Sequence, residues 1–286
     1  MRNFGNIIVH DFNSFARDLV DYVDAFDPAD ALARDTVRMV GGDVIPPLLR
    51  SLEERELHAV VGFDLETVAK LYRTSNGRMK RLIPTNDPRL HPDADHTDTA
   101  VLALMRGSVP YGCVASRLLW CEGTLAEEME SGRLWVSNPA AMWTAADRCI
   151  VRAPVAKQIR ACHVAFTGSI YLAQEVTGGA TLGAMLRLHY LWLVSHWRFS
   201  YMIGIIEGAL ARKHAFDVYG YGSMDMGIWR TRPGEGDELH RYELITTDRE
   251  TAMQSWLRRE TGDLTRPLGR PPVDVLPFEG ARAEGA

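Results

Sequence analysis

The chain has 286 residues, of which 46% are hydrophobic and 24% are charged, so it is long enough to bury a substantial core. Its 37 acidic and 32 basic residues give a formal net charge of -5, which excludes a global positive field for nucleic acid or anionic membranes. No apolar run reaches the roughly 18 residues of a membrane-spanning helix, and the N-terminus has no apolar signal segment. We therefore predict a soluble, cytoplasmic protein that does not bind membranes.

The first part of the chain, residues 1–96, is predicted to be mainly helical. Apolar residues from Phe12 to Val40 recur at helical spacing, and Asp64 is the expected N-cap of a helix over Leu65–Tyr72. A break at 75–77, a basic segment and a polar loop from Pro84 to Asp98 follow. We expect this region to pack on the core, with its aromatic residues either lining a substrate pocket or joining that core.

The second part, residues 97–262, is predicted to begin with strands and then to alternate strands with helices. Two apolar runs flank the segment Arg106-Gly107-Ser108-Val109-Pro110, which is typical of a β-hairpin. Thr124 and Glu127 have the spacing of a capping box for a short helix. Further strands are expected at 162–171, 199–206, 224–230 and 241–247, and further helices at 182–197, 208–216 and 248–259. The remaining residues, 263–286, form a Pro-rich and then Gly/Ala-rich tail that we expect to be extended.

A Gly-rich turn lies between the predicted strand at 162–171 and the helix at 182–197. Gly178, Gly179 and Gly183 would let a ligand approach the backbone closely, and Thr181 adds a hydroxyl. Because the first N–H groups of a helix lack acceptors and lie at the positive end of its dipole, such a turn is suited to phosphate. A Walker-type loop is excluded, since no Gly-Lys-Ser/Thr follows.

The element order and this turn resemble the GNAT superfamily of acyl-coenzyme A-dependent N-acyltransferases, over roughly residues 97–250. Aligned on Leu182-Gly183, the segment GGATLG matches the family's phosphate-binding turn, with Gly178 in place of Arg/Gln and Thr181 in place of the central glycine. The resemblance implies an acyl-CoA or acyl-phosphopantetheine co-substrate. The donor-binding residues that it implies are Tyr171, Leu172, Ala173, Gly178, Gly179, Ala180, Thr181, Leu182, Gly183 and Ala184.

The catalytic groups are predicted from the same resemblance. Gly220-Tyr221 matches the family's Gly-aromatic pair, and the family's frequent tyrosine acid falls on Phe216, so Tyr219 or Tyr221 would have to serve as proton donor. Glu175 and Glu207 follow predicted strands, where a carboxylate could relay a proton from the amine. Each of these residues is also compatible with a purely structural role.

Metal and thiol chemistry are less favoured. His91, Asp93, Asp95 and His96 could supply ligands, but their spacing on a Pro-containing loop matches no closed structural site, so no metal is predicted. The cysteines have no C-x-x-C spacing and are expected to be reduced core thiols. Cys162 and His163 point to opposite faces of a strand, which rules out their acting as a nucleophile and base pair there.

Residues 64–82 also match a helix-turn-helix with basic residues after the break. The alternative hypothesis is therefore that the protein is a DNA-binding regulator. The acidic balance of the chain and the early Pro84 count against it, and the same basic cluster could face an acyl carrier protein or a coenzyme A phosphate. Nucleic acid is therefore not the expected partner. A GNAT-fold protein with altered chemistry is a further alternative.

Taken together, the sequence predicts an α/β (α+β) protein with a GNAT-like mixed, mostly antiparallel sheet flanked by helices, preceded by a helical N-terminal region. The predicted activity is transfer of an acyl group from a CoA or carrier-protein thioester to the amine of a small molecule. The acyl chain, the acceptor and formation of a homodimer stay open.

Overall fold

The computed structural model describes residues 44–252, apart from 63, 75–81, 145, 212–218 and 232–237, together with residues 3–4, 7–8 and 10–11. The helices predicted before residue 44 therefore lie outside the described residues. So do Phe216, most of the basic segment after the break at 75–77, and the tail.

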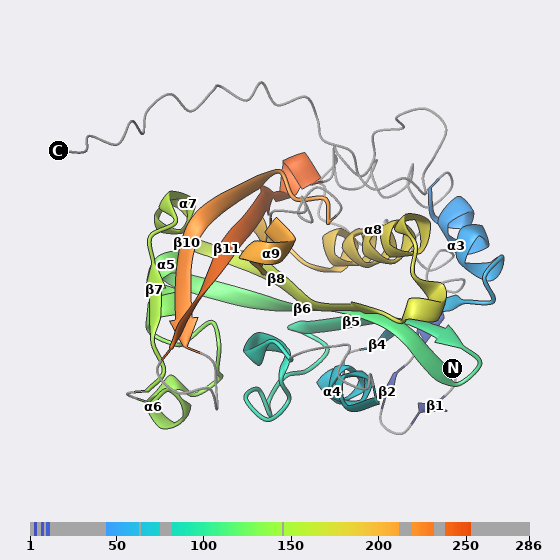
Figure 1. The fold of residues 1–286 in the computed structure, drawn as a ribbon, viewed down its shortest axis with the longest axis horizontal. Coiled ribbons are helices and arrows are strands. Elements are labelled where there is room, and N and C mark those ends of the chain that lie inside the picture. Colours follow the sequence, from blue (N-terminus) through green and yellow to red (C-terminus); the bar gives the residue numbers. More distant parts are fainter. Residues whose placement is uncertain are drawn as a thin grey trace.

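A nine-stranded sheet forms the centre of the described chain (Figure 1). Its strands run in the order β3-β4-β5-β6-β8-β9-β11-β10-β7, and all neighbours are antiparallel except β8 and β9. The strands are β3 (His10–Asp11), β4 (His58–Gly62), β5 (Thr99–Arg106), β6 (Val109–Thr124), β7 (Cys149–Val151), β8 (Arg160–Leu172), β9 (Tyr201–Glu207), β10 (Ser223–Thr231) and β11 (Leu239–Asp248), with β1 (Asn3–Phe4) and β2 (Ile7–Ile8) pairing separately. The predicted mixed, mostly antiparallel sheet is confirmed.

Helices cover both faces of this sheet. In Figure 1, α8 lies above β5 and β6 with α3 beside it, whereas α4 lies below. The helices are α3 (Ile45–Glu53), α4 (Leu65–Thr74), α5 (Leu125–Glu130), α6 (Pro139–Met142), α7 (Pro154–Gln158), α8 (Gly179–His196) and α9 (Gly208–Ala211), and the short 3-10 turns are η3 (Pro84–Asn86) and η4 (Gln174–Val176). None of the helices in the described ranges combines the length and hydropathy that crossing a bilayer requires.

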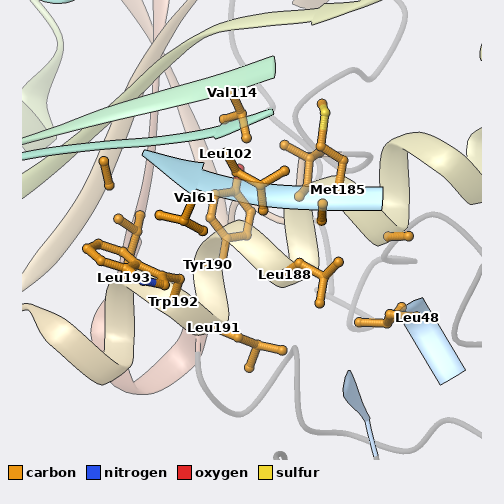
Figure 2. Packing of buried hydrophobic residues seen from close by; sticks show 14 of the residues in the cluster. Leu48, Val61, Leu102, Val114, Met185, Leu188, Tyr190, Leu191, Trp192 and Leu193 are labelled. Atoms are coloured by element: carbon orange, nitrogen blue, oxygen red, sulfur yellow. The ribbon is translucent and has the colours of Figure 1, made fainter. Parts of the chain in front are cut away.

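The larger core lies between α8 and the sheet. Residues 183–195 of α8 are all buried, as expected for a helix that is apolar on every side. Figure 2 shows Tyr190 of this helix beside Val61 of β4 and Leu102 of β5. Leu48 of α3 belongs to the same cluster, so residues of the N-terminal part complete the packing around α8.

The opposite face holds α4. Leu65, Val68 and Leu71 are buried against residues of β5 and β6, so the apolar side of this helix is used in packing. Asp64 accepts a hydrogen bond from the backbone N–H of Glu66 at 2.7 Å, which confirms it as the helix cap. The second half of the proposed helix-turn-helix falls almost entirely at residues 75–81, outside the described part.

Two local predictions in the second part are confirmed in detail. Thr124 Oγ1 accepts from the Glu127 N–H at 3.2 Å while the Glu127 carboxylate accepts from the Thr124 N–H at 2.7 Å, which completes the capping box. The hairpin closes with Arg106 opposite Val109, and Gly107 has φ +59°, a conformation that favours glycine at the first position of a two-residue turn.

Five strands were not predicted: β1, β2, β3 and β4, which fall inside the part expected to be mainly helical, and β7. In β4, Ala59 and Val61 point into the core and alternate with more exposed neighbours. β7 belongs to the long connection 125–158 between the neighbouring strands β6 and β8. This connection carries α5, α6 and α7 to the far edge of the sheet, where Cys149–Val151 pairs with β10.

Candidate active site

The most distinctive feature of the sheet is the point where β8 and β9 part. Their parallel pairing covers only three positions and ends at Phe166 opposite Ile203. Beyond it, β8 continues along β6 to Leu172, and β9 continues along β11 to Glu207. From this point on, the facing edges of the two strands have no partner strand among the described residues, so backbone N–H and C=O groups are left for a ligand.

A bulge bends β8 at the start of this opening. The register with β6 shifts between Cys113 and Ala115, and Ser169 in the extra segment has φ +52°. The Ser169 hydroxyl accepts from Asn86 Nδ2 at 3.2 Å, which fixes the bulge from the face that carries η3. The bulge therefore lies just beyond the last pair of β8 and β9, on the part of β8 that borders the opening.

The N-terminus of α8 lies directly after β8 and η4. Gly178 occupies the N-cap position without a side-chain cap, and the first backbone bond of the helix runs from Leu182 N–H to Gly178 O. The N–H groups of Gly179, Ala180 and Thr181 precede that bond and therefore have no intrahelical acceptor. Thr181 Oγ1 is buried and forms no hydrogen bond among the described residues. This helix start can accept an anion.

The later residues of the predicted turn play another part. Leu182 is half-buried, and Gly183 and Ala184 are buried within the first turns of α8, where backbone N–H groups already have intrahelical acceptors. Gly183 and Ala184 therefore lie in the contact between α8 and its surroundings. Of the predicted turn, only its first half exposes donors.

Arg55, which the sequence analysis did not single out, stands beside this helix start. A β-carbon built at Gly178 would lie 3.5 Å from Arg55 Nη1, and the Arg55 side chain is otherwise exposed. Arg106 donates to the Arg55 backbone carbonyl at 3.0 Å, so a second cation lies close by. Arg106 also pairs with Glu56 at 3.6 Å, so the cation that the turn between α3 and β4 brings to the N-terminus of α8 is Arg55.

The predicted edge at Tyr171, Leu172 and Ala173 is the last part of β8. Tyr171 and Leu172 pair with Cys113 and Gly112 of β6 and are half-buried. The Ala173 N–H donates to Tyr111 O at 2.7 Å, so that group is already used. A ligand at this edge must therefore be held by the side of β8 that faces β9.

Tyr221 reaches the base of the opening. Gly220, directly before it, has φ +76°, a left-handed conformation that favours glycine, and the Tyr221 ring lies in the core beside Tyr190 of α8, with 6.5 Å between the ring centroids. Its hydroxyl donates to Ile203 O at 3.3 Å, next to the last pair of β8 and β9. Burial raises the pKa of Tyr221, so the phenol stays protonated at neutral pH. Tyr219 is half-buried, and burial raises its pKa as well.

The two predicted carboxylates lie at the rims of the same opening. Glu175 belongs to η4 and is exposed, whereas Glu207 is the last residue of β9 and is half-buried. The structure thus brings Tyr221 to the point where the strands part, whereas Glu207 lies four residues further along β9 and Glu175 nearer the start of α8.

The groups considered for metal or thiol chemistry are engaged elsewhere. His91 Nε2 lies 2.9 Å from Trp135 O, and burial lowers the pKa of His91 to about 4. Within the described residues, no three His, Cys, Asp or Glu side chains gather as a metal site would require. All four cysteines are free, three of them buried and Cys162 half-buried, and burial raises the pKa of each thiol.

No protein-family model and no curated protein matches the sequence. Among solved structures, FeeM, an N-acyl amino acid synthase from uncultured soil microbes, aligns with a TM-score of 0.43 and 10% identity over 70% of this chain and 92% of its own. RimJ of Mycobacterium smegmatis, in complex with CoA-disulfide, aligns with a TM-score of 0.37 and 12% identity over 70% of this chain and 86% of its own. An uncharacterized protein of Bacillus halodurans aligns with a TM-score of 0.37 and 11% identity over 70% of this chain and 91% of its own. The fold of this chain is described by its own strand order, a mixed and mostly antiparallel sheet in which β8 and β9 are parallel over three positions and then part.

Proposed function

We propose that the protein is an N-acyltransferase that moves an acyl group from a pantetheine thioester to the amine of a small molecule. The observation that carries this proposal is the parting of β8 and β9 directly before an uncapped α8 N-terminus with Arg55 beside it. An extended amide-bearing arm fits between two strands with unpaired edges, because it can complete their hydrogen bonds. A phosphate at the end of that arm fits the helix start.

The chain's own residues would hold such a donor at two places. The N–H groups of Gly179, Ala180 and Thr181, with the Thr181 hydroxyl, would bind phosphate oxygens, and Arg55 would supply the positive charge that Gly178 lacks. The free edge of β8 from Thr167 onward would orient the arm. Coenzyme A and a carrier protein's phosphopantetheine share this chemistry.

The transfer itself would need little beyond positioning. The amine nitrogen attacks the thioester carbon, the C–N bond forms, and the C–S bond then breaks with its electron pair going to sulfur. Tyr221, protonated and next to the last pair of β8 and β9, is the best-placed donor for that sulfur. The nitrogen gives up its proton to solvent or to Glu207 at the end of β9.

Ligand-induced stabilisation tests the donor site. The unfolding midpoint is measured with CoA, an acyl-CoA, an acyl carrier protein loaded with the same acyl chain, and random duplex DNA. We expect stabilisation by one or both thioesters and none by DNA. Stabilisation by duplex alone would contradict the proposal and favour a regulator with a helix-turn-helix over 64–82.

Transfer is tested separately with the donor that binds. Release of free thiol is followed with a panel of amines that covers amino acids, polyamines and aromatic amines. We expect thiol release to depend on one class of amine and mass spectrometry to detect the matching amide. If the protein binds the thioester and no amine of any class accelerates thiol release, it is a GNAT-fold protein with altered chemistry.

A further inference from the structure

A chain of buried hydroxyl groups and one imidazole runs from α8 to Tyr221. Ser116 of β6 lies in its middle, with Oγ 2.8 Å from His189 Nε2 and 2.7 Å from Thr167 Oγ1. The Tyr221 hydroxyl has two side-chain hydrogen-bond partners, Thr167 of β8 and Tyr190 of α8. His189, Ser116, Thr167 and Tyr221 are each no more than 5% exposed, so water does not compete for these bonds.

Building on the proposed function, we propose that Thr167, Ser116 and His189 are positioning residues that direct the hydroxyl hydrogen of Tyr221 toward the leaving sulfur. Thr167 meets the opening through its backbone, at the free edge of β8, whereas its hydroxyl bonds to Ser116, which in turn bonds to His189. They act through the direction of their hydrogen bonds, because each hydroxyl carries a single hydrogen.

The directions follow from counting hydrogens along the chain. Tyr221 gives its hydrogen to Ile203 O, so towards its two side-chain partners, Thr167 and Tyr190, its oxygen can only accept. Thr167 has then used its hydrogen and must accept from Ser116. Ser116 must in turn accept from His189, which assigns the neutral imidazole the tautomer with hydrogen on Nε2. Every hydroxyl and imidazole hydrogen in this series of hydrogen bonds therefore points toward the place where β8 and β9 part.

The position of Tyr221 Oη also supports a role for its hydrogen at the place where β8 and β9 part. A β-carbon built at Gly204 would lie 3.0 Å from Thr167 O and 3.2 Å from Tyr221 Oη, which places the hydroxyl between β8 and β9 where they separate. Because Ile203 O accepts at a long 3.3 Å, the Tyr221 hydrogen is held weakly and can turn to a better acceptor. A thiolate leaving in the opening is such an acceptor.

The same hydrogen bonds stabilise the charge that Tyr221 carries during transfer. When the phenol gives its proton to sulfur, the phenolate keeps an electron pair that Thr167 stabilises by donating its hydrogen. Tyr221 then regains a proton from the nitrogen that has formed the amide, so that protons balance. The titratable groups that face Tyr221 are Tyr190 from α8 and Tyr219 from its own segment.

A matched pair of variants tests the proposal. Thr167→Val removes the hydroxyl and keeps the shape, whereas Thr167→Ser keeps the hydroxyl. With the acyl-CoA and amine that the wild type uses best, we expect Val to lower kcat about 10- to 100-fold, the range for one lost hydrogen bond to a charged group. KM for the thioester should not change, and Ser should retain most of the activity.

The deciding measurement is a double-mutant cycle with Tyr221→Phe. If Thr167 acts through Tyr221, Thr167→Val has no further effect on kcat in the Tyr221→Phe background. An equal loss in both backgrounds, or an equal loss for Ser and Val, would overturn the inference and assign the chain a structural role. Ser116→Ala, which removes only one oxygen, provides the same test one step further from Tyr221.

The two proposals fail in different ways. If the wild type transfers to no amine, the proposed function falls and this inference falls with it. If the wild type transfers and the cycle is additive, only the inference falls. Unfolding midpoints and stabilisation by CoA, measured for each variant, ensure that a loss of kcat is not a loss of folding or of donor binding.

Discussion

Arg55 and Gly178 lie side by side, although Arg55 belongs to the turn between α3 and β4 and Gly178 is the N-cap of α8. The backbone of the loop that holds Arg55 is constrained, since Glu56 has φ +57° and Arg106 donates to Arg55 O at 3.0 Å. The phosphate-binding turn of the resembled family begins with a basic or amide side chain, and here that position is Gly178. A cation from another part of the chain takes the place next to it.

Replacing Arg55 tests this arrangement. We expect Arg55→Gln to weaken CoA binding by roughly 10-fold, because one charged hydrogen bond to phosphate contributes about 1.5–3 kcal/mol and this exposed site is partly screened. Stability should hardly change. Isothermal titration at low and moderate salt measures the effect. Arg50→Gln, an exposed arginine on α3, is the control, and an equal loss there would mean that only net charge matters.

A negative charge placed at the start of α8 should raise the stability of the protein and lower its affinity for CoA. Gly178→Asp supplies a carboxylate cap, which we expect to stabilise the protein by a few tenths to about 1 kcal/mol. The same carboxylate repels a phosphate, so affinity for CoA should fall by about 10-fold or more. Gly178→Asn caps the helix without the charge and should keep more of the affinity. Urea unfolding and titration of CoA give both numbers, and tighter CoA binding by the Asp variant would contradict the site.

Much of the fold could be predicted because its signals are local. The hairpin around Gly107 and the capping box of Thr124 depend on residues close in sequence, and the structure has both. β4 was missed because its alternation covers only His58–Gly62, which a sequence window blends with the helix before it. β7 was missed because three residues form a strand only where the edge of β10 is available.

The site was less predictable, because its residues lie far apart in the sequence and meet only in the folded structure. The turn at 178–181 has a sequence signal, and so does the Gly220-Tyr221 pair. Arg55 carries no such signal, since its position beside α8 follows from the packing of α3. In the sequence, His189 stands among the apolar residues of a predicted helix, and nothing marks it as part of a site. Its bond to Ser116 becomes visible only when β6 and α8 are placed together.

Two buried histidines should make stability depend on pH. Burial lowers the pKa of His189 to about 3 and that of His91 to about 4, below the ordinary 6.5. Below pH 6.5 the unfolded chain therefore binds protons that the folded chain does not, and stability falls as pH falls toward those values. Each histidine should remove up to about 1.4 kcal/mol per pH unit in that window.

Urea unfolding between pH 7.5 and 5 checks this dependence. We expect the slope of unfolding free energy against pH to be smaller in His91→Gln, where an amide N–H can still donate to Trp135 O. His189→Gln should reduce the slope by a similar amount. Unchanged slopes in both variants would show that neither imidazole is held neutral by the fold.

Gly204 offers a final test, because space at the base of the opening is limited. An added β-carbon would meet Thr167 O at 3.0 Å and Tyr221 Oη at 3.2 Å, and the backbone oxygen cannot move aside alone. We expect Gly204→Ala to destabilise the fold by about 1–3 kcal/mol through overpacking and to lower kcat by displacing the Tyr221 hydroxyl. Gly222→Ala is the matched control, since its β-carbon would meet only ordinary contacts from 3.4 Å. Equal unfolding free energies for the two variants would show that β8 and β9 can separate further at this point, and normal kcat in Gly204→Ala would remove Tyr221 from the reaction.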